Sequence, residues 1–154
     1  MKRLGYTLLF LVINFGGLAL GSWLMDGGPT SAWYLDLNKA PWTPPGWAFG
    51  VAWSLIMICF SIYLSFLFTL RNSTYVYLLF ILQFILNVGW NYVFFNQQLV
   101  GFGLATIVLL TLLIAYLFIS FGDEELSKAR YLLVPYILWL CIATSLNAYI
   151  LLNN

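Results

Sequence analysis

Aromatic and proline residues crowd one stretch of the chain, between Trp33 and Trp53. Its 21 residues include four tryptophans, one tyrosine and three prolines. Proline fixes φ and removes a backbone donor, so Pro41, Pro44 and Pro45 stiffen this connection. Tryptophan and tyrosine combine an apolar ring with one polar atom, which suits them to a membrane–water boundary or to holding a flat ligand. The stretch therefore predicts a rigid aromatic segment at an interface.

Polar and aromatic side chains also share one face in each of two later apolar runs. Near residues 75–95, helical spacing brings five side chains within about 100° of arc: Gln83, Asn87, Trp90, Asn91 and Phe94. The run near 131–152 has a similar face, formed by Tyr136, Trp139, Ala143, Leu146 and Asn147. Amides inside a membrane face a bundle interior, where they either bond neighbouring helices or line a ligand pocket. Both interpretations stay open, and both can hold at once.

The residues that usually carry catalysis are missing from the apolar runs. The chain has no histidine, and no Asp, Glu, Lys or Arg lies within these runs. Nucleophile–base catalysis, proton relays and carboxylate metal sites therefore lack their usual parts, and no metal site is predicted. Cys59 and Cys141 have no metal-type spacing and are predicted to be buried free thiols. A ligand is expected to be flat, apolar and held by stacking plus a few amide hydrogen bonds.

The elements that position these residues follow from composition. With 63% hydrophobic residues, 7% charged residues and a mean hydropathy of +0.94, the chain has too little polar surface for a water-soluble globule. At about 1.5 Å per residue, five apolar runs are long enough to cross a hydrocarbon core of about 30 Å. They lie near 4–25, 45–70, 75–95, 99–121 and 131–152. The predicted fold is an all-α integral membrane protein, one domain over residues 1–154 with five transmembrane helices, because an open sheet edge cannot sit in lipid.

Charge predicts how these helices lie in the membrane. The net charge is only +1, and the absence of a basic run or phosphate-binding loop argues against a nucleic-acid partner. One side of the predicted bundle carries all the basic residues but Lys39: Lys2, Arg3, Arg71, Lys128 and Arg130. The positive-inside rule then predicts a cytoplasmic amino terminus and a carboxyl terminus outside. The connection 26–43 is placed outside, and its length predicts that it covers an opening.

Local signals refine three of the helices. Asn14, Gly17 and Gly21 share one face of the first helix, where ordinary close helix packing is the favoured interpretation over a functional site. Thr43 is predicted to cap the second helix with its hydroxyl, followed by prolines in the first turn. Pro135 is predicted to bend the first half of the last helix.

The combination of these motifs resembles the translocator protein family, also called tryptophan-rich sensory proteins or peripheral-type benzodiazepine receptors. The resemblance begins in the first long connection with Trp33-Tyr34, Lys39, Pro41-Trp42-Thr43-Pro44-Pro45, Trp47 and Trp53. It continues over nearly the whole chain in Gln83, Leu86-Asn87, Trp90, Phe94-Phe95, Ala129-Arg130, Pro135-Tyr136, Trp139-Leu140, Thr144 and Leu146-Asn147.

The resemblance implies a five-helix bundle that often forms homodimers, with a pocket under the first loop. It implies porphyrins, such as protoporphyrin IX and haem, and synthetic benzodiazepine-site drugs as ligands, with no required cofactor. The implied ligand-binding residues are Trp53, Asn87, Trp90, Tyr136, Trp139 and Asn147, and those of a lid are Trp33, Tyr34, Lys39, Pro41 and Trp42. Animal members also bind cholesterol through a pattern that needs a basic residue after the last-helix tyrosine. None follows Tyr149, which argues against high-affinity sterol binding.

Three functions are compatible with this sequence. The favoured one is a membrane receptor or carrier for porphyrins, which saturable quenching of tryptophan fluorescence would support. The second is light-dependent porphyrin degradation, for which Trp53 and Trp139 are the oxidisable candidates and which illumination of the complex would detect. The third is a ligand-responsive sensor or scaffold, which rests on family likeness alone. Short loops and the lack of an amino-terminal targeting extension predict a bacterial cytoplasmic membrane.

Overall fold

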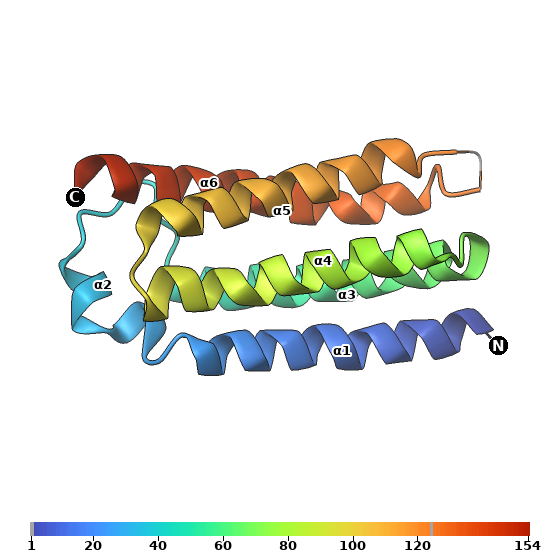
Figure 1. Ribbon diagram of the computed structural model, residues 1–154, viewed down its shortest axis with the longest axis horizontal. Coiled ribbons are helices and arrows are strands. Elements are labelled where there is room, and N and C mark those ends of the chain that lie inside the picture. Colours follow the sequence, from blue (N-terminus) through green and yellow to red (C-terminus); the bar gives the residue numbers. More distant parts are fainter. Residues whose placement is uncertain (1, 124) are drawn as a thin grey trace.

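Five long helices run antiparallel along one axis in the computed structural model, which describes residues 2–123 and 125–154 (Figure 1). They are α1 (Lys2–Leu24), α3 (Gly46–Leu70), α4 (Thr74–Asn91), α5 (Val100–Ser120) and α6 (Val134–Asn153). Four short elements join or extend them: η1 (Gly28–Thr30), α2 (Ala32–Asp36), the π-helix η2 (Tyr92–Asn96) and η3 (Ala129–Leu133). No strand occurs in the described residues. Each long helix, with its short extension where it has one, is long and apolar enough to cross a membrane. The predicted all-α bundle is confirmed.

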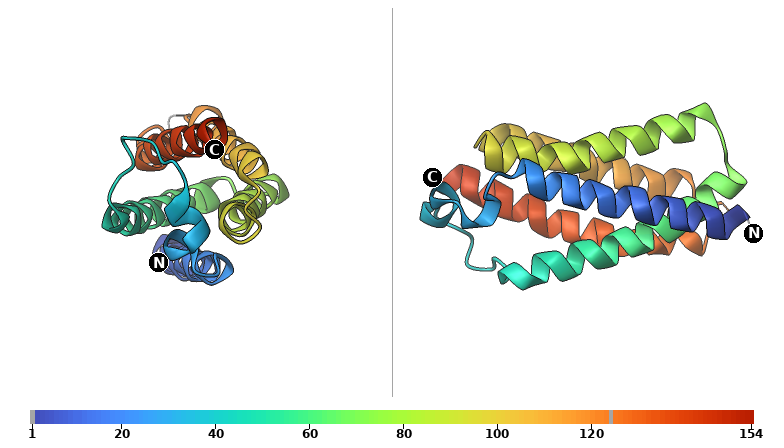
Figure 2. Two further views of the ribbon diagram at one scale, coloured as in Figure 1. Left: turned by 90° about the vertical axis from the view of Figure 1, so that its left-hand side faces the viewer. Right: turned by 90° about the horizontal axis from the view of Figure 1, so that it is seen from below.

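The long helices close into a ring. Seen end-on in Figure 2, α1 packs on α3 and α4, α5 packs on α4 and α6, and α3 completes the ring against α6. Such a ring has a centre that side chains must fill or leave open.

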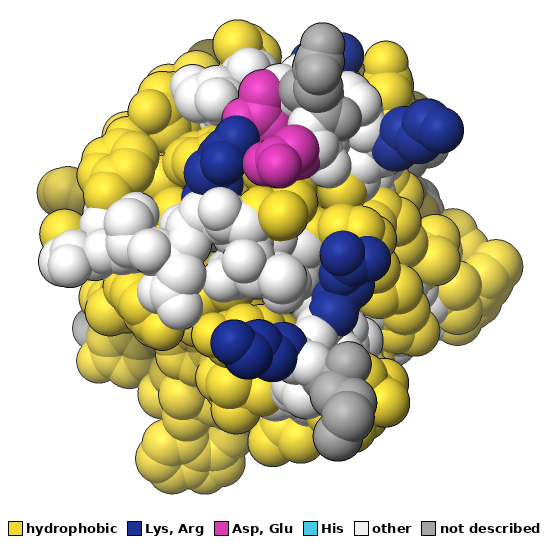
Figure 3. All heavy atoms as spheres, turned by 90° about the vertical axis from the view of Figure 1, so that its right-hand side faces the viewer, with side chains coloured by type: hydrophobic (Ala, Val, Ile, Leu, Met, Phe, Trp, Pro, Cys, Tyr) yellow, Lys and Arg dark blue, Asp and Glu magenta, His cyan; other side chains and the backbone are white. Residues whose placement is uncertain are grey.

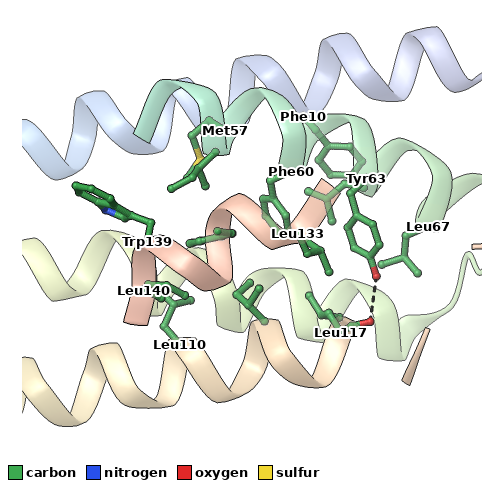
Figure 4. Packing of buried hydrophobic residues seen from close by; sticks show 14 of the residues in the cluster. Phe10, Met57, Phe60, Tyr63, Leu67, Leu110, Leu117, Leu133, Trp139 and Leu140 are labelled. Atoms are coloured by element: carbon green, nitrogen blue, oxygen red, sulfur yellow. Dashed lines mark hydrogen bonds between the residues drawn. The ribbon is translucent and has the colours of Figure 1, made fainter. Parts of the chain in front are cut away.

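Toward the amino-terminal end, the centre is filled by interdigitating apolar side chains (Figure 4). Phe60, Tyr63 and Leu67 of α3 are at most 1% exposed and meet Leu117 of α5 and Leu133 of η3. The Tyr63 hydroxyl donates to the Leu117 carbonyl at 3.4 Å, so its polar atom has a partner inside the bundle. Dense packing of this kind supplies the dispersion energy that holds helices together in lipid.

The first helix is fastened by the face that the sequence predicts. Asn14, Gly17 and Gly21 are all buried, and the Asn14 side-chain amide donates to the Ser61 hydroxyl of α3 at 2.9 Å. A Cβ added at Gly17 would lie 2.8 Å from the Phe84 ring, and one at Gly21 would lie 2.7 Å from the Asn91 amide of α4. These glycines therefore let α1 approach α4 closely, which is a packing role.

Two local predictions about helix ends are wrong. Pro45 is the cap residue of α3, while the Thr43 hydroxyl donates to the Ala40 carbonyl at 2.7 Å, because the chain turns before the helix begins. Pro135 lies in the first turn of α6, where it displaces no helical hydrogen bond, and the 3-10 turn η3 precedes it.

The two cysteines are free, as predicted, but neither is buried. Cys59 is partly exposed and Cys141 is exposed, because each lies on an outward face of its helix.

Charged side chains gather at the end of the bundle opposite α2 (Figure 3). Arg71 pairs there with Asp123, and its other guanidinium nitrogen lies 3.2 Å from Glu125. The hydrogen bond from Arg71 holds the pKa of Asp123 below its ordinary value. The ion pair joins the α3–α4 turn to the segment after α5.

Candidate ligand-binding site

The other half of the bundle is hollow beneath the connection between α1 and α3. We call this connection, residues 25–45, the first loop; it crosses the end of the bundle that carries α2 (Figure 1). A cavity of about 370 Å³ lies under it, within the roughly 300–1,000 Å³ usual for small-molecule sites. We call it the aromatic cavity, and its walls come from the first loop, α3, α4, η2, α5 and α6: Met25, Pro29, Tyr34, Lys39, Thr43, Pro44, Gly46, Phe49, Trp53, Trp90, Asn91, Phe95, Ile107, Trp139 and Ala143.

Three indoles from three helices form much of this wall. Trp53 of α3, Trp90 of α4 and Trp139 of α6 all line the aromatic cavity. Phe49 meets Trp139 edge-on with ring centroids 5.1 Å apart, and Trp90 stacks on Phe94 at 5.2 Å. Such contacts fix the orientation of the rings, so their free faces are available in advance to a flat partner.

Polar groups in the aromatic cavity are few. The Trp139 indole N–H is buried and has no hydrogen-bond partner in the part of the chain that the structure describes. Burial raises the pKa of Tyr34, so its hydroxyl remains a neutral donor at physiological pH. The Lys39 ammonium donates to the carbonyls of Tyr34 at 2.8 Å, Leu35 at 3.1 Å and Leu37 at 3.4 Å. Lys39 thus hydrogen-bonds the free carbonyl groups at the end of α2 and places a positive charge at the rim of the aromatic cavity.

The first loop is fastened on two sides. Toward α6, the Trp42 indole N–H donates to the Ser145 hydroxyl at 3.1 Å, and the Asn38 backbone N–H donates to the Asn154 side-chain oxygen at 2.8 Å. Toward η2, the Tyr34 ring lies 5.3 Å from the Phe95 ring. These contacts span the cavity and hold the loop over it.

The remaining sequence-predicted residues lie around the aromatic cavity and do not line it. Tyr136 is buried below, where its hydroxyl accepts from the Gln83 amide at 2.9 Å. Asn147 accepts from the Trp90 indole at 3.2 Å and donates to the Val100 carbonyl at 3.0 Å, so it joins α4, α5 and α6.

The predicted first-loop residues divide in the same way. Tyr34 and Lys39 line the aromatic cavity, whereas Trp33 packs against Phe94 of η2 with ring centroids 5.7 Å apart. Pro41 and Trp42 are exposed and do not line the aromatic cavity; the Trp42 ring meets Tyr149 of α6 edge-on at 5.4 Å.

A second cavity of about 500 Å³, which we call the side cleft, lies between α1, α3 and α4. Asn87 lines the side cleft, and its side chain has no hydrogen-bond partner among the described residues. The side cleft and the aromatic cavity share five wall residues: Met25, Pro29, Phe49, Trp53 and Asn91. The two spaces are therefore neighbours, and Phe49 and Trp53 are the two aromatic side chains that border both.

Sequence comparison shows which family this chain belongs to. The model of the TspO/MBR family matches residues 9–152. The chain belongs to this family. The tryptophan-rich protein TspO of Chlorobaculum tepidum is 37% identical over 82% of each chain, and that of Archaeoglobus fulgidus is 31% identical over 100% of this chain and 97% of its own. The human translocator protein is 30% identical over 79% of this chain and 75% of its own.

Several residues that line the aromatic cavity were not predicted as site residues. Phe49 lies four residues before Trp53 on the same face of α3, and that helical spacing was a usable signal. Phe95 follows Phe94, but only the extra residue of the π-turn brings both rings inward. Met25 and Ile107 carry no signal that separates them from ordinary apolar packing.

A metal centre has no support in the described part of this TspO/MBR chain, where no three His, Cys, Asp or Glu residues come together. What the site offers is aromatic surface, a buried N–H donor and a positive rim. These suit non-covalent binding of a flat, mainly apolar molecule.

Proposed function

We propose that this integral membrane protein is a receptor or carrier that binds porphyrins, or closely related flat apolar ligands, in the aromatic cavity. The observation that carries this proposal is the convergence of Trp53, Trp90 and Trp139 on one cavity. A porphyrin macrocycle presents a broad π-face, and preordered indoles bind such a face at little entropic cost.

The charged propionates of a porphyrin lie at the rim in this proposal. Burying them unpaired in an apolar cavity would be very costly. The Lys39 ammonium and the aqueous side of the first loop supply a place where their charge is balanced. The Trp139 N–H, which has no partner among the described residues, is the donor that remains for a polar edge of the ligand.

The first loop acts as a lid over the bound ligand in this proposal, and it faces the outside of the cytoplasmic membrane. The gathering of basic side chains at the opposite end supports a cytoplasmic amino terminus. A homodimer is part of the proposal because members of this family often form one.

Tryptophan fluorescence tests binding. Protoporphyrin IX should quench the emission saturably at low micromolar concentrations, and Trp139→Phe should weaken binding by about tenfold, because ring area and the N–H donor are lost. Trp47→Phe is the matched control, since Trp47 is 72% exposed and lines neither cavity. Absence of saturable quenching in the wild type would refute the proposal.

A second candidate function is light-dependent degradation of the bound porphyrin. It is favoured by the position of Trp53 and Trp139, both of which line the aromatic cavity, so two oxidisable rings would touch the excited ligand. Illumination in air should then bleach the porphyrin absorbance faster in the wild type than in the Trp53→Phe, Trp139→Phe double variant. Equal decay at equal occupancy would assign the bleaching to the porphyrin alone.

A further inference from the structure

The side cleft lies where α1 and α3 diverge. In Figure 2 the two helices separate toward the first-loop end. Deeper in the bundle they are joined by the hydrogen bond from Asn14 to Ser61. Gly50 of α3 lines the side cleft and is exposed, and a Cβ added there would meet no atom within 4 Å. The mouth of the side cleft is therefore open at Gly50.

Much of this mouth is bordered by segments that are long and apolar enough to span a membrane. Its walls include Leu18 and Ser22 of α1 and Ser54 of α3, all within helices that are apolar enough to span a membrane. Ser54 lies eight residues into α3, which at about 1.5 Å per residue places it about 12 Å from the helix start. The side cleft thus descends from the interface into the hydrocarbon layer.

The interior of the side cleft carries one buried amide without a partner. Asn87 is 8% exposed and lines the cleft, and its carboxamide makes no hydrogen bond within residues 2–123 and 125–154. Ser22, which is exposed, and Ser54, which is partly exposed, also line the cleft. An unpaired amide is costly in an apolar interior, so Asn87 indicates a passing or bound molecule with a polar edge.

Entry into the aromatic cavity through the first loop would require more rearrangement than entry through the side cleft. Raising the first loop would break the Trp42–Ser145 and Asn38–Asn154 hydrogen bonds and separate Tyr34 from Phe95. Passage from the side cleft to the aromatic cavity requires movement of side chains that line both spaces, among them Phe49 and Trp53, and leaves the hydrogen bonds of the first loop intact. Rotamer changes of this kind are much less demanding than displacement of an anchored loop.

We infer that the side cleft between α1 and α3 is an entrance through which a flat, amphipathic ligand passes from the surrounding lipid into the aromatic cavity. Phe49 and Trp53 are its gate, and Asn87 and the two serines meet the polar edge of the ligand on the way. The inference rests on the proposed binding function, because it assigns a route to the same cavity.

Binding kinetics test the route. In lipid nanodiscs, Gly50→Leu should slow association and dissociation of protoporphyrin IX by about tenfold each and leave Kd unchanged, because it narrows the mouth without touching the aromatic cavity. Gly16→Leu is the control: Gly16 of α1 is exposed, has open space at its Cβ and lines neither cavity. Unchanged rates in Gly50→Leu, or a change in Kd with unchanged association, would overturn the inference.

A loop variant separates the two routes. Trp42→Phe removes the indole hydrogen bond to Ser145 and keeps an aromatic ring at this position. Association should keep the wild-type rate if the ligand enters through the side cleft. Faster association in Trp42→Phe would show that the loop opens for the ligand and would refute the side entrance.

A measurement without ligand keeps this inference separate from the proposed function. A nitroxide on Ser54→Cys, in a Cys59→Ala, Cys141→Ala background, should be relaxed more by lipid-soluble oxygen than by a water-soluble nickel chelate. Stronger relaxation by the nickel chelate would show that the side cleft opens to water, and would overturn the inference whatever porphyrin does. Failure of porphyrin binding with an oxygen-exposed Ser54 site would instead reject only the proposed function.

Discussion

The two halves of this bundle are made from the same five helices and differ in what occupies their centre. In the amino-terminal half, Phe60, Tyr63 and Leu64 of α3 are at most 1% exposed and are surrounded by apolar side chains. In the half beneath the first loop, the same helix presents Phe49 and Trp53 to two cavities. One helix therefore serves a filled centre and a hollow one within seven turns.

The difference follows from the shapes of the side chains that each half places at the centre of the bundle. The filled half combines branched aliphatic residues with aromatic rings, and these shapes interdigitate at high density. The hollow half places large flat rings next to small residues such as Gly46 and Ala143, which leaves volume between the rings. A filled centre stabilises the bundle, whereas a hollow one provides a binding surface at some cost in packing energy.

The largest effect should come from truncating one phenylalanine in each half. Phe60→Ala removes a side chain with 0% exposure and should destabilise the protein by about 3 kcal/mol, because it leaves a void among packed neighbours. Phe49→Ala, on the same helix, should cost less than about 1 kcal/mol, because its ring already borders empty space. Thermal unfolding of both variants in the same detergent measures the difference. Equal losses of stability would show that the two halves are packed alike.

The sequence predicted the helices and their inward faces because hydropathy and helical spacing determine both. Asn14, Trp139 and Asn147 are all buried on faces predicted from 100° spacing. Hydropathy and helical spacing are therefore enough to predict which helix faces point into the bundle.

The roles of individual polar residues were less readable, since they depend on which helices become neighbours. The Asn147 side chain accepts a hydrogen bond from Trp90 and donates one to the Val100 carbonyl, so it joins helices and does not line the aromatic cavity. Asn87, which carries the same chemical group, has no described partner and lines the side cleft. Two asparagines thus have different roles, and the packing of the helices around each of them decides which role it has. The side cleft itself had no signature in the sequence, because it arises from the divergence of two helices.

An intermediate effect is expected from Lys39, which stabilises the roof of the hollow half. Lys39→Met should remove three donors from the carbonyl end of α2 and weaken that short helix by about 1 kcal/mol. Hydrogen exchange should then accelerate about fivefold at α2 amides and stay unchanged in α3, because the filled half does not depend on the loop. Lys128→Met, an exposed lysine at the opposite end, is the control. Unchanged exchange in α2 would mean that the aromatic contacts alone hold the loop.

The smallest effect should come from the ion pair that closes the filled half. Because Arg71 lowers the pKa of Asp123 in the folded protein, the pair stabilises the fold above the ordinary aspartate pKa of 3.8. That contribution should disappear as pH falls through the lower folded pKa, since the carboxylate then takes a proton and loses Arg71. Asp123→Asn should therefore have a slightly lower Tm than the wild type at pH 7, and the two Tm values should converge as the pH is lowered. Asp36→Asn, near the first loop, is the control and should show no such pH-dependent difference from the wild type. The effect is small because both partners are exposed and water screens them. A wild type and an Asp123→Asn variant that stay equally stable from pH 7 downward would show that apolar packing alone holds this end.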